Sequence, residues 1–222
     1  MVLEGYGEFS EKFELFKEIL ENYNKKYNLT AICDEKEVYI KHFFDSVKPQ
    51  NYFPDGAKVV EIGSGGGFPS VPLKIIRDDL SFTLIESTGK KCEYLKTVVD
   101  KLGLKGVQVL NIRAEDGGKD HNLRESFDVA TARAVARLNT LCEYCLPYVK
   151  VGGIFIAYKG DSDEEIKESR NAVKILGGEI EKVEKYDLPE DFGKRAVIVI
   201  KKVKPTPGKY PRGRGLERKK PL

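Results

Sequence analysis

Apolar residues recur at helical spacing in the first 50 positions and gather in short runs from residue 58 onward. Residues 9–27 place seven aromatic and aliphatic side chains on one stripe, which predicts an amphipathic helix with Ser10 as its N-cap. We interpret this stripe as core rather than as a platform for stacking bases. Residues 34–48 predict a second helix, in which Asp34 and Glu37 form a capping box and which Pro49 ends. Residues 1–50 are therefore expected to form a helical extension.

After residue 58, strand-like runs alternate with segments of helical length. This alternation predicts parallel strands joined by right-handed crossovers in a doubly wound α/β sheet. The last two runs have no helix between them, so we expect an antiparallel pair at one edge. The prediction is a Rossmann-like, mostly parallel seven-stranded sheet in a domain spanning 51–203. Its strands are predicted at 58–62, 81–86, 107–112, 127–132, 153–158, 179–188 and 194–203, and its helices near 70–77, 89–102, 134–146 and 162–176.

Composition narrows the class of protein. The 222 residues are 41% hydrophobic, enough for one good core, and no apolar run approaches the ~18–20 residues that span a bilayer. The first residues carry acids where a signal peptide has a basic region. We therefore expect a cytoplasmic monomer without a membrane partner. Cys142 and Cys145 have zinc-ligand spacing but no second pair, so we interpret them as buried helix thiols and expect no metal site.

Charge is distributed unevenly along the chain. Residues 201–222 carry +8 and the remainder −5, for a total of +3. A basic tail punctuated by proline and glycine, spanning 204–222, is typical of an arm that binds a polyanion, most often nucleic acid. Composition alone is equally consistent with a solvated tail that improves solubility.

The segment EIGSGGGFPSVPL, residues 61–73, follows the first predicted strand and precedes a helix, the context of a nucleotide site. A Walker loop is excluded because Gly67-Phe68-Pro69 supplies neither its lysine nor its hydroxyl. A dinucleotide fingerprint requires a small residue where Phe68 stands. Pro69 and Pro72 also remove backbone N–H donors that would hold a pyrophosphate.

S-adenosylmethionine, which has no phosphate, fits the pattern better. Glu86 ends the second predicted strand, 23 residues after Gly63, where an acid can accept both ribose hydroxyls. Glu115 lies in the turn after the third strand, on the expected adenine side. Acidic residues also suit a cationic sulfonium. The alternative is a tight turn that needs its glycines only for conformation; the two glutamates at successive strand ends favour the methyl donor.

Several further motifs occur in a shared order and spacing: NLTAI (28–32), ESTGKK (86–91), the Arg-Ala-Glu turn (113–115), TARAVARL (131–138) and KYPRGRGLERKKPL (209–222). Together they resemble the small-subunit ribosomal RNA guanine-N7 methyltransferase family, also known as glucose-inhibited division protein B. The resemblance covers residues 25–222. It implies S-adenosyl-L-methionine as cofactor, N7 of a guanine in the 530 loop of 16S ribosomal RNA as acceptor, near the decoding site, and the small ribosomal subunit as partner.

The resemblance also implies roles for individual residues. The glycine loop and Phe68 would line the methionine part, Glu86 with its two followers the ribose, and the Ala-Glu pair the adenine. No proton-transfer residue is expected, because guanine N7 carries a lone pair and no proton. The implied cofactor residues are Gly63, Gly65, Gly67, Phe68, Glu86, Ser87, Thr88, Ala114, Glu115 and Arg133; the positioning candidates are Arg133 and Lys159; and the RNA-binding candidates are Lys209, Tyr210, Arg212 and Arg214.

His42, Asp45 and Ser46 could indicate a hydrolase triad, but all three fall on one predicted helix. We interpret them as a helix face that packs on the sheet or closes over the cofactor. Two other functions remain as alternatives: a non-catalytic protein that binds ribosomal RNA or assists ribosome assembly on the same fold, and a methyltransferase with a different acceptor.

Overall fold

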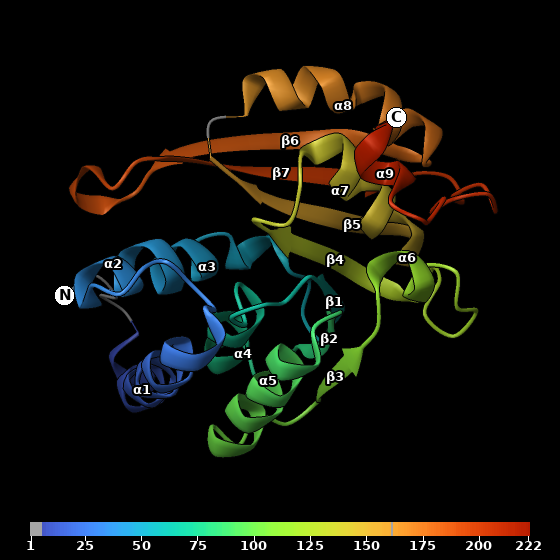
Figure 1. The fold of residues 1–222 in the computed structure, drawn as a ribbon. Helices are drawn as coiled ribbons and strands as arrows, with labels where there is room; N and C mark the ends of the chain where they lie inside the picture. Colours follow the sequence, from blue (N-terminus) through green and yellow to red (C-terminus); the bar gives the residue numbers. More distant parts are fainter. Residues whose placement is uncertain (1–5, 161) are drawn as a thin grey trace.

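A computed structural model describes residues 6–160 and 162–222, which form one seven-stranded sheet with helices on both faces (Figure 1). The strand order is β3-β2-β1-β4-β5-β7-β6. The strands are β1 (Lys58–Ile62), β2 (Ser81–Glu86), β3 (Val107–Asn111), β4 (Phe127–Arg133), β5 (Val149–Lys159), β6 (Gly178–Asp187) and β7 (Lys194–Lys202).

The topology confirms the predicted doubly wound sheet. β1 pairs in parallel with β2 on one side and β4 on the other, while β7 pairs antiparallel with both β5 and β6. The chain builds outward from β1 to β3 and then returns to the other side of β1. The strand order therefore reverses between β1 and β4, and ligands bind at the carboxyl edge of such a reversal.

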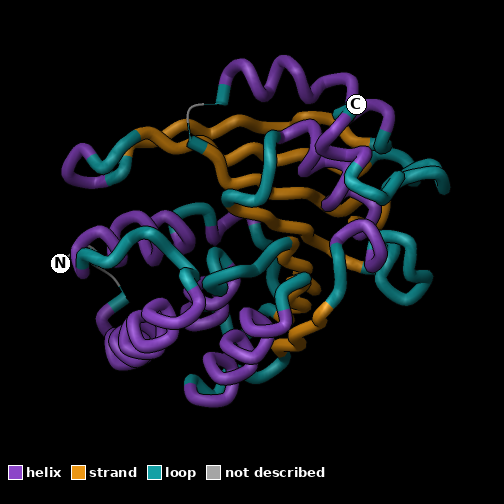
Figure 2. Tube along the Cα trace, viewed as in Figure 1, coloured by secondary structure: helices purple, strands orange, loops and turns teal. Residues whose placement is uncertain are grey.

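Alternation along the strands explains why both faces are covered. Val59 belongs to one buried cluster and Val60 to the other, because successive side chains of a strand point to opposite faces. Figure 2 shows helices flanking the twisted sheet on both sides. The first cluster packs against α1 (Ser10–Tyr27), α4 (Ser70–Ile76) and α5 (Gly89–Lys101), and the second against α7 (Leu138–Cys145) and α8 (Asp163–Ile175).

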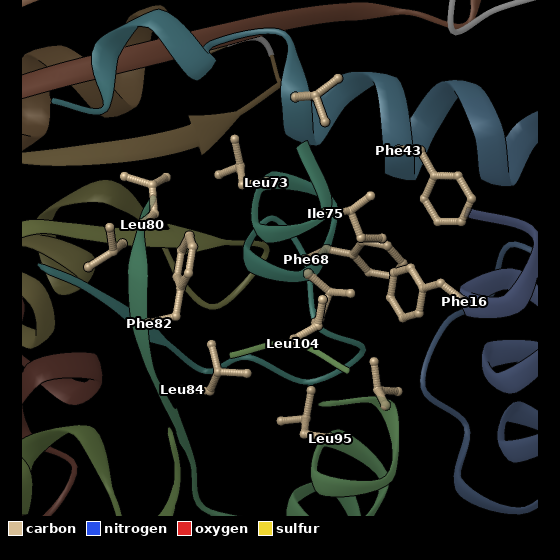
Figure 3. Close-up of a cluster of buried hydrophobic side chains, with 14 of the residues drawn as sticks. Phe16, Phe43, Phe68, Leu73, Ile75, Leu80, Phe82, Leu84, Leu95 and Leu104 are labelled. Atoms are coloured by element: carbon tan, nitrogen blue, oxygen red, sulfur yellow. The ribbon is translucent and has the colours of Figure 1, made fainter. Parts of the chain in front are cut away.

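The N-terminal aromatic stripe is core, as predicted. Phe16 lies 5.5 Å from Phe43 and 5.3 Å from Phe68, measured between ring centroids, so α1, the following helix and the glycine loop meet in one aromatic cluster (Figure 3). The second helix is continuous but uneven. It begins at α2 (Glu35–Glu37), passes through a π-helical stretch (Val38–Phe44) and ends at α3 (Asp45–Val47).

Two local predictions had different outcomes in this region. Asp34 caps the second helix as expected, its Oδ1 accepting from the Glu37 amide at 3.0 Å. Ser10 is not an N-cap, because a 3-10 turn (Gly7–Phe9) precedes it and its own backbone is already helical. A second correction concerns α7, which begins at Leu138 rather than at residue 134. Ala134 adopts a left-handed φ of 57°, which keeps residues 134–137 in a loop.

The C-terminal residues do not leave the body of the protein. After β7 they run beside α7 and end in the short helix α9 (Leu216–Lys219), drawn in red in Figure 1. Tyr210 is part of the second buried cluster. The basic tail is therefore packed against the fold over its described length.

Candidate functional site

A cavity of about 760 Å³ lies at the carboxyl ends of the central strands, beside the reversal of strand order. Its floor comes from the turns that follow β1, β2 and β4, and the helix that contains His42 contributes its other wall. A second cavity of about 400 Å³ shares Gly63, Ser87 and Val135 with the first. The two cavities therefore form one cleft with a waist at these three residues.

The glycine loop after β1 depends on glycine at specific positions. Gly63, Gly65 and Gly67 all have positive φ, at 71°, 48° and 87°. A Cβ on Gly63 would lie 2.7 Å from a Val135 methyl, and one on Gly67 would lie 2.8 Å from a Val71 methyl. Only glycine permits both this backbone and this close approach. Gly63 and Gly65 line the larger cavity and Gly67 shapes the turn from below.

Glu86 ends β2 and ties the two turns of the site together. Its carboxylate accepts from the amide of Gly65 at 3.0 Å and from the amide of Thr88 at 2.8 Å. The side chain is 6% exposed and lines the larger cavity with Ser87 and Thr88. The structure thus places the predicted ribose residues next to the glycine loop. Glu86 also holds the two turns together, a structural role that the spacing in the sequence did not reveal.

The smaller cavity contains the residues predicted for the adenine. Ala114 and Glu115 begin α6 (Ala114–Gly117) and line this cavity together with Ile112. The Tyr148 hydroxyl donates to the Ala114 carbonyl at 2.7 Å and so holds the turn in place. The predicted cofactor residues other than Gly67 therefore line one cleft.

A network of polar side chains joins the N-terminal helices to β4. The Arg133 guanidinium donates to the Lys41 carbonyl at 3.1 Å and to Asp45 Oδ2 at 3.2 Å, and it contacts His42 Nδ1 at 3.0 Å. Its central carbon lies 4.9 Å from the centroid of the Phe68 ring. Arg133 is thus a clamp that holds the second helix over the glycine loop, and it lines the larger cavity.

His42 is held on both sides and stacks on Phe68, with ring centroids 4.3 Å apart. Burial, together with the neighbouring positive charge of Arg133, lowers the pKa of His42 to about 3. The ring is therefore neutral near pH 7, accepting from Arg133 at Nδ1 and donating from Nε2 to Thr30 Oγ1 at 2.8 Å. With both nitrogens engaged, it serves as a wall of the cleft.

The hydrolase interpretation has no support in the geometry. Ser46 is fully buried and its hydroxyl donates to the His42 carbonyl. Asp45 accepts from Arg133 and from the Tyr186 hydroxyl at 2.8 Å, and it lies 3.5 Å from Arg195. The three residues face different partners, as expected for a structural helix face.

One buried acid close to the site was missed by sequence reasoning, although it lines neither cavity. Glu61 on β1 is fully buried, and neither carboxylate oxygen has a hydrogen-bond partner among the described residues. Burial raises the pKa of Glu61 to about 7, an effect that Ser70 and Arg133 only partly oppose. An acid inside an otherwise apolar strand was the signal that could have identified it.

These observations fit S-adenosylmethionine. The cleft has a glycine floor for close approach and the Glu86 carboxylate at the strand end. A cationic ligand is favoured beside the Glu86 carboxylate, whereas a pyrophosphate is disfavoured there. The described residues hold no group of three or more potential metal-ligating His, Cys, Asp or Glu side chains. Cys142 and Cys145 are buried, and burial raises the pKa of both thiols.

The second positioning candidate, Lys159, lines the larger cavity from the end of β5. Its ammonium donates to the Ala136 carbonyl at 3.0 Å and pairs with Glu165 at 2.7 Å. Lys159 therefore shapes the loop after β4 as well as the cavity.

Two of the four RNA-binding candidates are placed where they cannot act as predicted. Tyr210 is 6% exposed within the second core cluster, so its ring is not available to stack on a base. The Arg212 guanidinium is engaged by the buried carboxylate of Glu143, at 2.7 Å for the closest pair of atoms. Burial removes the Tyr210 ring from solvent, and the ion pair with Glu143 occupies the Arg212 guanidinium, whose side chain remains 23% exposed. Lys209 and Arg214 are exposed.

Within the described part of the chain, no helix is both long and apolar enough to cross a membrane.

The sheet order, the antiparallel edge and the cleft at the carboxyl ends define a class I methyltransferase fold of the kind that uses S-adenosylmethionine. A solved structure of the same class, M. jannaschii TYW2 in complex with AdoMet, aligns with a TM-score of 0.52 and 14% identity over 70% of this chain and 74% of that one. Residues 9–192 match the family described as rRNA small subunit methyltransferase G. The chain belongs to this family and is an S-adenosylmethionine-dependent methyltransferase.

Individual relatives agree over nearly the full length. The chain is 46% identical over 230 residues to a protein of Lactobacillus johnsonii named "Ribosomal RNA small subunit methyltransferase G", covering 99% of this chain and 96% of that protein. A protein of Brevibacillus brevis with the same name is 47% identical over 215 residues, covering 96% and 90%.

Proposed function

We propose that this protein transfers a methyl group from S-adenosylmethionine to N7 of a guanine in 16S ribosomal RNA, in the 530 loop near the decoding site. The observation that carries the proposal is its identity of 46%, over 99% of the chain, to a protein named for methylating small-subunit ribosomal RNA. The motifs quoted from the sequence support the guanine N7 acceptor.

The residues of the cleft would divide the cofactor between its two cavities. The larger cavity would take the methionine part, with the glycine loop beneath it and Phe68 at its side; the smaller would take the adenine beside Ala114 and Glu115. Glu86 lines the larger cavity and precedes Ser87 at the waist, so the ribose hydroxyls would reach its carboxylate there. When bound, the cofactor supplies a methyl group on a cationic sulfonium.

The reaction requires little chemical participation by the protein side chains. Guanine N7 has an in-plane lone pair and no proton, so no general base is required. This agrees with a cleft in which His42 is neutral and engaged at both nitrogens. The contribution of the chain is to orient the base and exclude water. Arg133 and Lys159 are proposed to hold O6 or phosphate oxygens, since a donor bound to N7 itself would block methylation.

The proposed partner is the small ribosomal subunit or its RNA, bound by a monomer in the cytoplasm. Lys209 and Arg214 are the proposed phosphate contacts outside the cleft, because both are exposed on the C-terminal segment. Exposed basic side chains supply the salt-dependent part of RNA affinity.

The test is methyl transfer from labelled cofactor to small subunits or to naked 16S ribosomal RNA, with Glu86→Ala as the impaired variant and the exposed Glu93→Ala as its control. We expect label in the RNA with the wild-type protein. RNA binding without label would instead support the non-catalytic assembly protein.

The modified base is then mapped by borohydride reduction and aniline cleavage, which is selective for N7-methylguanine. A single cleavage in the 530 loop is expected. Incorporated label that resists cleavage would point to a different acceptor and overturn the N7 assignment.

A further inference from the structure

The C-terminal residues 205–222, here called the C-terminal strap, are bound to the body at several points. Arg124 donates to the Thr206 carbonyl at 2.7 Å and to the Tyr210 carbonyl at 2.8 Å. The fully buried Lys202 donates to Thr206 Oγ1 at 2.7 Å. Buried backbone groups of the strap thus have partners in the fold, which is the condition for a stable docked conformation.

An ion pair fastens the middle of the strap to α7. Glu143 is 1% exposed, and its carboxylate accepts from the Arg212 backbone amide at 2.8 Å and from the Arg212 Nε and Nη2 atoms at 2.9 and 2.7 Å. Such a bidentate contact fixes the orientation of the Arg212 guanidinium as well as its distance from Glu143. The strap is therefore held in one position along α7.

The end of the strap is shaped by Glu217. Its side chain is fully buried and accepts from the Gly213 amide, while its carbonyl accepts from Thr140 Oγ1 at 2.9 Å. These contacts close the turn that leads into α9 and anchor α9 on α7. They also determine which side of α9 faces the cleft.

That side carries Arg218. Gly215 and Arg218 line the smaller cavity, as do Ala114 and Glu115. The Arg218 Nη2 atom lies 3.3 Å from the carbonyl oxygen of Val135, a residue at the waist of the cleft. The strap is thus one wall of the cavity, and a guanidinium stands on that wall.

We infer that the strap closes the adenine side of the cofactor cleft and that Arg218 is its cofactor-contacting residue. The inference rests on the proposed placement of the adenine in the smaller cavity. A planar guanidinium can lie against the face of a purine ring, an attraction that strengthens where water is excluded. Arg113 also lines this cavity, but its side chain is 70% exposed and its guanidinium lies 3.9 Å from the Glu115 carboxylate. Arg218 is therefore the cationic group that the strap supplies to a slot that suits a neutral aromatic base.

This role differs from that of an RNA arm, and it couples the strap to the cofactor. Because ligand binding and strap docking share a wall, each must favour the other to the same extent. Loss of the Arg218 side chain is expected to weaken both S-adenosylmethionine and S-adenosylhomocysteine on the order of tenfold, which corresponds to about 1.4 kcal/mol. The loss of affinity should be equal for the two ligands, because both contain adenosine and they differ only by the methyl group on the sulfur.

The experiment is calorimetric titration of both ligands into the full-length wild-type protein, Arg218→Ala and Lys219→Ala. Lys219 is the matched control, because it is exposed, belongs to the same short helix and does not line the cavity. Arg218→Ala should lose affinity for both ligands and Lys219→Ala for neither. Without ligand, the melting temperature of Arg218→Ala should match wild type, and only the rise produced by ligand should be smaller.

The opposite results are equally clear. Unchanged affinity in Arg218→Ala, or a loss confined to S-adenosylmethionine, would overturn the inference while leaving the methyltransferase function intact. Absence of binding by the wild-type protein would overturn the proposed placement of the cofactor instead. If Arg218→Ala loses RNA affinity and keeps cofactor affinity, the strap would instead be an arm that binds RNA.

Discussion

His42 illustrates how one buried side chain can couple the site to the stability of the fold. It stacks on Phe68, accepts from Arg133 and donates to Thr30, so it joins three segments that are distant in sequence. Protonation would place a second positive charge against Arg133. The neutral ring is therefore part of the folded structure.

A pH dependence follows from this histidine. Its pKa is about 3 in the folded state and near 6.5 when unfolded. The stabilisation is fully present above pH 6.5 and is lost as the pH falls toward 3, because only the unfolded chain takes up the proton. Between pH 7 and pH 5 this group should lower the free energy of unfolding by about 2 kcal/mol.

Urea denaturation at both pH values would measure this loss in wild type, His42→Asn and His121→Asn. His42→Asn should be less stable at pH 7 and should lack about 2 kcal/mol of the acid dependence. His121 is the control because its side chain is 91% exposed. Parallel pH profiles for wild type and His42→Asn would refute the assignment.

Glu86 gives a second prediction for a single side chain. Its carboxylate holds the amides of Gly65 and Thr88, and it is the proposed partner of the ribose. Glu86→Ala should weaken cofactor binding by roughly 1–3 kcal/mol, because a charged acceptor is removed. Calorimetry checks this against Glu93→Ala, an exposed acid on α5. Equal affinity in the two variants would contradict the role of Glu86.

Among the structural elements, the glycine loop shows how packing adds to backbone conformation. Gly67 and Gly56 both have positive φ, at 87° and 67°. A Cβ on Gly67 would lie 2.8 Å from a Val71 methyl, whereas one on Gly56 would meet nothing within 4 Å. The two positions therefore separate the effect of φ from that of crowding.

Alanine at each position should resolve the two effects. Gly56→Ala should cost about 1 kcal/mol from the left-handed backbone alone. Gly67→Ala should cost about 1–3 kcal/mol more, since α4 must shift to admit the methyl group. Denaturant unfolding gives both values. Similar losses in the two variants would mean that Val71 moves aside freely.

For the molecule as a whole, the exposed positive charges of the strap determine how RNA affinity should respond to salt. Lys209 and Arg214 are exposed on the strap, while Arg212 is neutralised by Glu143. If the two exposed side chains each meet one phosphate, the double variant Lys209→Ala/Arg214→Ala should reduce the slope of log K against log salt by about 1.4–1.8.

RNA binding measured across a salt series would test this, with cofactor affinity expected to stay unchanged. Lys101→Ala/Lys105→Ala is the matched control, because these exposed residues lie at the end of α5 and before β3, outside the strap, and line neither cavity. A slope reduced equally by both double variants would indicate general electrostatic attraction rather than contacts of the strap.

The sheet and much of the cleft could be predicted from the sequence because their causes are local. The alternation of Val59 and Val60 between the two cores reflects the period of a strand, and the conformations of Gly63 and Gly67 reflect a turn that only glycine permits. The position of Glu86 at a strand end follows from the same pattern. Parallel strands then bring these turns to one edge.

Other features depend on contacts between distant residues. The charge of Arg212 is identical whether it meets a phosphate or Glu143, which lies 69 positions earlier, so composition could not choose between them. Tyr210 likewise became core only when the strap met α7, and Arg218 reached the smaller cavity for the same reason. Glu61 is unusual only because the sheet is covered on both faces around it. Local patterns specified the elements and their ends, whereas the partners of long charged side chains were set by how those elements pack, since an ion pair depends on distance in space and not on separation along the chain.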